Sequence, residues 1–205
     1  MAYNSRVCSK SINILSRIGF QVSCSDLNYS IEVSSENSYY DGLSSGNKKK
    51  LNQCIRDGFY VKKLKELDYP KAYDIILQNR ISKNYPISVT KNQFKEMTSV
   101  FANDILCFGV FSQDSKDLIA SSICIKVSDE VLYVFYWGDI PLESSHSPII
   151  ILSSFLYEFC LENKFKILDI GTSTSNGEPN YGLVRFKENI GFKESLKYTM
   201  EFKKT

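Results

Sequence analysis

One stretch decides how the chain folds, and it reads Leu168-Asp-Ile-Gly-Thr-Ser-Thr-Ser-Asn-Gly-Glu-Pro-Asn-Tyr-Gly-Leu-Val-Arg-Phe-Lys-Glu-Asn-Ile-Gly-Phe192. Its pattern predicts a short buried strand over 166–170, then a loop rich in Gly, Ser, Thr and Asn, then a helix over 181–190. Gly191 follows the helix, and a residue without a Cβ readily takes the positive φ that ends one. Lys187 lies beside the apolar face of this helix, where a cation either extends to water or meets an anion.

Two protein families contain stretches of this kind. Leu168-Asp-Ile-Gly-Thr-Ser173 resembles the nucleotide-binding turn of Rossmann methyltransferases. A doubly wound domain, however, needs several further βα units after that turn, and only 35 residues follow Ile170. Phe186-Lys-Glu-Asn-Ile-Gly-Phe192 resembles the last helix and turn of GNAT-type acyltransferases, in particular the FemAB-like and cellulose-biosynthesis-type acetyltransferase branch. In that branch a strand ending in Asp-x-Gly leads through a loop into a Phe-Lys helix and Gly-Phe.

The composition is that of an ordinary globular protein, with 205 residues, 43 % hydrophobic residues, 23 % charged residues and a net charge of +2. The chain has no apolar run of membrane-spanning length and no basic-then-apolar N-terminus, so we expect a cytoplasmic protein with no membrane partner. The small net charge gives no electrostatic reason to expect nucleic acid. Six cysteines without a CxxC pair and a single histidine argue against zinc, so we expect reduced thiols and no metal cofactor.

The GNAT resemblance implies a GNAT-like domain over 43–205 and an N-terminal extension over 1–42 that packs on the domain or leads into it. In the extension we expect a short helix ending at Gly19 and a strand over 30–33. Helices in the domain are predicted over 43–56, 70–83, 89–101 and 147–163, besides 181–190. Strands are predicted over 59–64, 105–111, 118–127, 131–137, 166–170 and 192–202.

The predicted fold class is mixed α/β, an α+β sheet with flanking helices. The order β-α-α-β-β-β-α-β-α-β over roughly 43–202 is similar to that of a GNAT domain. Short polar connections at 112–117 and 128–130 can join only antiparallel neighbours. The helix between Val131–Trp137 and Lys166–Ile170 makes these two strands a right-handed parallel pair. The GNAT resemblance implies that this pair splays apart while the rest of the sheet is mostly antiparallel.

The resemblance also implies that acetyl-CoA or another acyl-CoA lies in this gap, as co-substrate, with its pyrophosphate on the N-terminus of the following helix. Such a terminus has unpaired N–H groups and a positive dipole. The cofactor-binding residues expected there are Ser144, Ser145, His146 and Ser147, together with Tyr136 and Trp137 at the strand end. This serine-rich loop departs from the common GNAT pattern of glycines with an Arg or Gln, so the acyl group stays open.

Catalytic residues are also implied by the resemblance. Many GNAT enzymes have a proton-donating Tyr four residues before the Gly of the final Gly-Phe, and this chain has Lys187 there, as FemAB-like members tend to. A partly desolvated ammonium could give that proton to the leaving thiolate, or hold a phosphate. Asp169, Glu178 and Asp139 are the candidate bases, although an Asp before Gly-Thr-Ser also commonly ties a loop together. We expect Asp139 and Tyr181 to contact the acceptor.

The leading hypothesis is an enzyme, an acyl-CoA-dependent N- or O-acyltransferase that works by direct attack in a ternary complex, because no Cys accompanies a His as nucleophile and base. Its branch implies a small-molecule acceptor, an amino sugar or another cell-envelope precursor. One alternative is an aminoacyl-tRNA-dependent transferase of the FemAB type, the only hypothesis with a nucleic-acid partner. The other is a catalytically inactive GNAT-fold binding module. The oligomeric state stays open, with a homodimer among the states considered.

Overall fold

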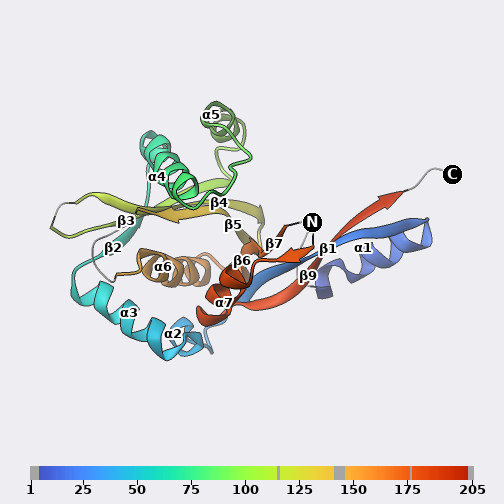
Figure 1. Ribbon diagram of the computed structural model, residues 1–205, viewed down its shortest axis with the longest axis horizontal. Helices are drawn as coiled ribbons and strands as arrows, with labels where there is room; N and C mark the ends of the chain where they lie inside the picture. The colour runs from blue at the N-terminus through green and yellow to red at the C-terminus, as the bar shows by residue number, and fades with distance from the viewer. Residues whose placement is uncertain (1–4, 115, 141–145, 176, 203–205) are drawn as a thin grey trace.

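The computed structural model describes residues 5–114, 116–140, 146–175 and 177–202. Its centre is a seven-stranded sheet in the order β2-β3-β4-β5-β6-β1-β9, beside a small β7–β8 hairpin (Figure 1). The strands are β1 (Phe20–Glu32), β2 (Tyr60–Lys63), β3 (Ile105–Phe111), β4 (Leu118–Ser128), β5 (Val131–Asp139), β6 (Ile167–Thr172), β7 (Thr174–Ser175), β8 (Glu178–Pro179) and β9 (Lys193–Phe202). The helices are α1 (Ser5–Arg17), α2 (Tyr39–Gly42), α3 (Ser45–Arg56), the 3-10 turn η1 (Glu66–Asp68), α4 (Tyr69–Ser82), α5 (Lys91–Val100), α6 (Pro148–Glu162) and α7 (Tyr181–Asn189).

The predicted fold class is confirmed. β5 and β6 form the parallel pair, joined by α6, and the other pairings in the large sheet are antiparallel. Helices α4 and α5 cover one face of the sheet, whereas α6, with α3 and α2 beyond it, covers the other (Figure 1). Each face therefore has its own apolar core, one built around Leu152 and Leu156 of α6 and the other around Tyr73 and Ile76 of α4.

The N-terminal strand is much longer than its sequence suggests. We expected a strand over 30–33, but β1 covers thirteen residues and lies between β6 and β9. The sequence does not predict this strand, because its residues are mostly polar. Of its thirteen residues only Asn28 and Tyr29 are buried, and four of the first six are exposed. Its length comes instead from pairing with β9, from Phe20 opposite Phe202 to Ser30 opposite Lys193. The division of the chain at residue 43 stays a prediction, but β1 is a strand of the same sheet.

The parallel pair opens as the GNAT resemblance implies. The paired residues are Val131 with Ile167, Leu132 with Leu168 and Tyr133 with Asp169. Beyond them both strands leave the regular path. Phe135 is an extra residue in β5 between partners of two consecutive β4 residues, which makes a β-bulge, and Gly171 in β6 has a φ of +74°. Because bulges bend and twist a strand, β5 and β6 diverge and leave an open gap.

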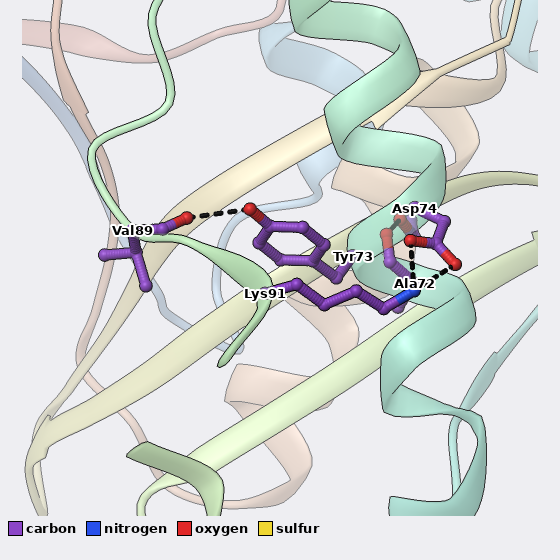
Figure 2. A network of polar contacts seen from close by, with 6 residues as sticks. Ala72, Tyr73, Asp74, Val89 and Lys91 are labelled. Atoms are coloured by element: carbon purple, nitrogen blue, oxygen red, sulfur yellow. Dashed lines mark hydrogen bonds and ion pairs between the residues drawn. The ribbon is translucent and has the colours of Figure 1, made fainter. Parts of the chain in front are cut away.

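Helix α4 is fixed firmly beside this gap. The Tyr73 hydroxyl donates to the Val89 carbonyl oxygen at 2.8 Å, and Lys91 Nζ donates to both carboxylate oxygens of Asp74 at 2.6 and 2.7 Å (Figure 2). On the sheet side, Ser121 Oγ donates to the Ala72 carbonyl oxygen at 2.7 Å. These contacts hold the helix against β4 and against the segment that leads to α5. The last turn of α4 therefore has a defined position beside the end of β5, where Asn79 contacts Asp139.

Candidate functional site

The open part of the β5–β6 gap is a cleft of about 560 Å³. Its walls are the last turn of α4, the ends of β5 and β6, and the beginnings of α6 and α7. A volume of this size falls within the usual range of small-molecule sites, roughly 300–1,000 Å³. The cleft therefore brings together segments that lie as far apart in the chain as Asn79 and Lys187.

Lys187 lines the cleft at the end of β6, where its side chain is buried. Its side chain comes from α7 and the residue is 2 % exposed. Nζ donates to the carbonyl oxygens of Ile170 at 3.0 Å, Gly171 at 2.8 Å and Thr172 at 2.9 Å. These carbonyls belong to the part of β6 that has left β5. An ammonium has three N–H donors, so the three carbonyls occupy all of them.

The electrostatic surroundings of Lys187 are dominated by its burial. Burial lowers the pKa of Lys187 to about 7, and the Asp169 carboxylate acts in the opposite direction. Protonation of Lys187 near neutral pH therefore balances two effects. Desolvation favours the neutral amine, whereas the three carbonyls favour the ammonium, because a neutral amine can donate to only two of them.

Asp169 is buried beneath the strand pair. Its Oδ1 accepts a hydrogen bond from the Gly171 backbone N–H at 2.7 Å, and its Oδ2 accepts one from Asn28 Nδ2 at 3.1 Å. Burial raises the pKa of the Asp169 carboxyl, and these two hydrogen bonds oppose the shift. The carboxylate thus ties the turn at Gly171 to β1, and Asp169 is not among the described residues that line the cleft.

The expected phosphate cradle is only partly on the cleft. Ser147 lines it at the start of α6, and its hydroxyl makes no capping hydrogen bond to the helix. His146 is turned the other way, with Nε2 2.7 Å from Asp57 Oδ2 and its ring centre 4.7 Å from that of Phe59. Ser144 and Ser145 lie outside the described residues. The N-terminus of α6 therefore faces the cleft without the imidazole.

Among the other expected residues, Tyr136, Trp137 and Asp139 line the cleft. The Tyr136 hydroxyl accepts a hydrogen bond from the Ser88 backbone N–H at 3.1 Å. Asp139 Oδ1 accepts one from Asn79 Nδ2 at 2.8 Å. Glu178 in β8 and Tyr181 at the start of α7 are both exposed, Tyr181 by 66 %, and the described lining includes neither.

The sequence analysis missed the wall that α4 contributes. Asn79 and Arg80 line the cleft from the last turn of this helix, and Lys83 and Tyr85 line it from the residues that follow the helix. Apolar spacing identified the buried face of α4 but could not say that its end reaches β5. One signal was present in the sequence, because Asn79 lies three residues after Ile76 and so falls on the apolar side of the helix. In the structure Asn79 is only 7 % exposed. A buried amide needs a partner, and Asp139 provides it.

Two further features of the described part of the chain bear on the site. No group of three or more His, Cys, Asp or Glu side chains that could hold a metal ion occurs among the described residues. Within the same residues, no helix is both long and apolar enough to cross a bilayer.

Comparison with known proteins finds similar folds among solved structures. No protein-family model matches the chain, and no curated protein matches it in sequence. Among solved structures, FemX superposes with a TM-score of 0.77 at 9 % identity over 92 % of this chain and 66 % of FemX. L-PGS from Bacillus licheniformis gives 0.64 at 10 % identity over 95 % of this chain and 66 % of L-PGS. A tandem GNAT protein from the clavulanic acid biosynthesis pathway gives 0.55 at 8 % identity over 98 % of this chain and 58 % of that protein.

These similarities show the fold and set its limits. The chain has the GNAT-like fold that these structures share. This agrees with the resemblance of Phe186–Phe192 to the last helix and turn of GNAT-type proteins. It spans about two thirds of the length of FemX and of L-PGS, 66 % in each case. Identities near 10 % place no individual residue of the site by homology.

Replacing Lys187 tests its contribution to the fold. Lys187→Met keeps the length and apolar stem of the side chain but leaves three backbone carbonyls without their donor. Because a buried unsatisfied polar group is costly, we expect the free energy of unfolding to fall by about 3 kcal/mol. Urea denaturation measures this loss. Lys193→Met, at an exposed position, is the control and should change it little. Equal stability of the two variants would contradict the assigned role.

The lowered pKa of Lys187 predicts a pH dependence of stability. Between about 7 and the ordinary lysine value, the unfolded chain binds a proton that the folded chain has released, so this residue's contribution to stability rises with pH. We therefore expect the difference in unfolding free energy between wild type and Lys187→Met to increase from about pH 7 to about pH 9.5. A difference that stays constant or shrinks would mean that the carbonyls keep the ammonium charged throughout.

Proposed function

We propose that this chain is an acyltransferase that moves an acyl group from a CoA thioester to an amine or hydroxyl of a small polar acceptor in the β5–β6 cleft. The observation that carries the proposal is the divergence of β5 and β6 after Tyr133, beside the N-terminus of α6. A strand edge without a partner can pair with the amides of an extended pantetheine, as it would with a further strand. The neighbouring helix terminus suits the pyrophosphate.

The donor would lie on the α6 side of the cleft. The fifteen-residue α6 begins with Pro148, which has no N–H, and the Ile150 N–H donates to the Ser147 carbonyl oxygen at 2.9 Å. The donors that this helix end offers to the cleft are therefore the Ile149 N–H and the Ser147 hydroxyl. Trp137 packs its ring edge-on against Phe186 at 6.4 Å between ring centres and forms an apolar wall for the pantetheine and acyl chain. Ser144 and Ser145 remain proposed phosphate ligands.

The chemistry would need no covalent enzyme intermediate. The acceptor nitrogen or oxygen attacks the thioester carbon, the C–S bond breaks, and CoA leaves as a thiolate. Asp139 is our proposed base for the acceptor proton, because it is the one of the three candidate carboxylates that lines the cleft. In its protonated form, which the lowered pKa of about 7 confines to neutral pH and below, Lys187 would favour the departing thiolate through its charge. It could act as the proton donor only after giving up one of its three carbonyl partners.

For the acceptor we propose an amino sugar or another cell-envelope precursor, as the FemAB-like resemblance implies. The reaction would then take place in the cytoplasm, where CoA is available. A second candidate is an aminoacyl-tRNA-dependent transferase of the FemAB type. It is suggested by the FemAB-like resemblance of Phe186–Phe192, and the TM-score of 0.77 with FemX agrees with that resemblance at the level of the fold.

Ligand-induced stabilisation separates these functions. At a concentration about a hundredfold above Kd, a ligand stabilises the folded state by about 2.7 kcal/mol, which for a domain of this size raises Tm by about 5–10 °C. We expect this rise with acetyl-CoA or CoA. A rise with aminoacyl-tRNA alone would support the second candidate, and no rise with either would support an inactive binding module.

A steric variant shows whether the ligand occupies the proposed cleft. Leu183→Trp adds an indole to the cleft wall and should abolish the rise in Tm that CoA causes. Leu67→Trp makes the same change at a position that is 89 % exposed on η1 and should leave the rise intact. Equal responses of the two variants would place the CoA site elsewhere.

Replacing the proposed base tests the mechanism. Asp139→Asn should lower kcat by roughly 100-fold, the usual contribution of a general base, while the Kd for CoA stays the same. Release of the CoA thiol in the presence of a panel of amino sugars measures the rate. Glu178→Gln, at an exposed position off the cleft, is the matched control. A rate that falls equally in both variants would remove Asp139 from the mechanism.

A further inference from the structure

Arg80 is an unusual residue for the wall of a cleft. Its guanidinium carbon lies 4.5 Å from the centre of the Tyr136 ring, so the cation stacks on the aromatic face. Its Nη1 donates to the Pro86 carbonyl oxygen at 2.6 Å. The Tyr136 ring and the Pro86 carbonyl together fix the orientation of the guanidinium. Its position is fixed by α4, which is held to β4 and to the segment before α5.

The positive charge of Arg80 has no counter-ion among the residues that the structure describes. None of the ion pairs in that part of the chain includes it, and its Nε is buried without a hydrogen-bond partner there. A guanidinium has five N–H donors, and the bond to Pro86 is the one that the described residues provide. Partial burial lowers the pKa of Arg80, because a half-buried guanidinium loses part of its hydration without gaining a counter-ion among these residues.

The charges around the cleft do not offset Arg80. Among the residues that the structure describes, the lining also contains Lys83 and Lys187, against a single carboxylate, Asp139. The donors of Lys187 are taken up by backbone carbonyls. Asp139 is shared by Asn79 at 2.8 Å and by Lys83 Nζ at 3.7 Å. The whole chain carries only +2, so positive charge is concentrated where the substrates would meet.

Arg80 stands on the opposite side of the sheet from the helix terminus proposed for the donor. Tyr136, on which it stacks, belongs to the core under α4 and α5, whereas Trp137 packs into the core under α6 and α7. Helices α4 and α6 cover opposite faces of the sheet (Figure 1). An anion at Arg80 would therefore belong to the second substrate and not to the CoA pyrophosphate at α6.

We propose that Arg80 and Lys83 form a subsite for a phosphate group carried by the acceptor. This inference rests on the proposed function and adds the class of the acceptor, a molecule that carries a phosphate group. Arg80 lies in the last turn of α4, and Lys83, three positions later, is the residue that ends this helix. Residues three apart lie on the same side of a helix. A planar guanidinium offers paired donors to a phosphate, and a nearby lysine adds a second charge for its second negative charge. Lys83 is half exposed and only loosely paired, so it can turn toward such a ligand.

The experiment uses inorganic phosphate and pyrophosphate as probes, so it needs neither CoA nor catalysis. Isothermal titration should detect binding of one or both to the wild type, with acetate binding more weakly. Arg80→Gln should weaken that binding at least about tenfold, the effect expected when a charge-assisted hydrogen-bonding pair is lost. Arg56→Gln is the matched control, because Arg56 is 73 % exposed and lies on α3 away from the cleft. Arg80→Lys keeps the charge without the fork and should bind in between, and circular dichroism checks that each variant is folded.

Three outcomes would overturn the subsite. These are the absence of phosphate and pyrophosphate binding to the wild type, equal binding by wild type and Arg80→Gln, and acetate binding as tightly as phosphate. If Arg80→Gln also weakens CoA binding, the anion belongs to the donor, and the assignment to the acceptor is wrong. If the probes bind through Arg80 but CoA does not bind the wild type, the proposed function fails while the phosphate site stands.

Discussion

The interaction between the Lys187 ammonium and three consecutive carbonyls of β6 is the one on which the cleft depends. A parallel strand pair that opens midway loses its ladder hydrogen bonds, and buried backbone groups cannot be left without partners. On β6 the carbonyls of Ile170, Gly171 and Thr172 are satisfied by one side chain from α7. The same contact holds α7 under the strand end, so the shape of the strand and the position of the helix are determined together.

The two strands reach the open state by different means. On β5 the change is local to the backbone, with the bulge at Phe135 two residues after the last pair with β6. On β6 it is a glycine in the left-handed region, Gly171, whose N–H is held by the buried Asp169 carboxylate. A buried lysine and a buried aspartate thus serve the geometry of a single strand end. Their pKa shifts follow from that burial, and such shifts also occur at purely structural sites.

Much of the fold could be predicted because its deciding signals are local. The Gly191 terminator, the Ser-Pro start of α6 and the apolar strands between 105 and 137 each report their own structure. β1 could not be found this way, because its polar residues are held by pairing with β9, at the other end of the chain. The sequence marked Lys187 and Asp169 as important, but whether they face a substrate or the backbone depends on how three separate segments pack. His146 likewise turns toward Asp57, eighty-nine positions earlier, for reasons that its own loop does not contain.

A crystal structure of the chain with bound CoA would show whether the opened strand pair is the donor site. We expect the pantetheine to run between β5 and β6 beyond Tyr133, the pyrophosphate to lie at the start of α6, and Lys187 Nζ still to contact the three β6 carbonyls. A structure in which β5 and β6 are paired to their ends would contradict this expectation. So would one in which CoA binds away from this gap, or one in which Lys187 turns out to solvent while the strands stay apart.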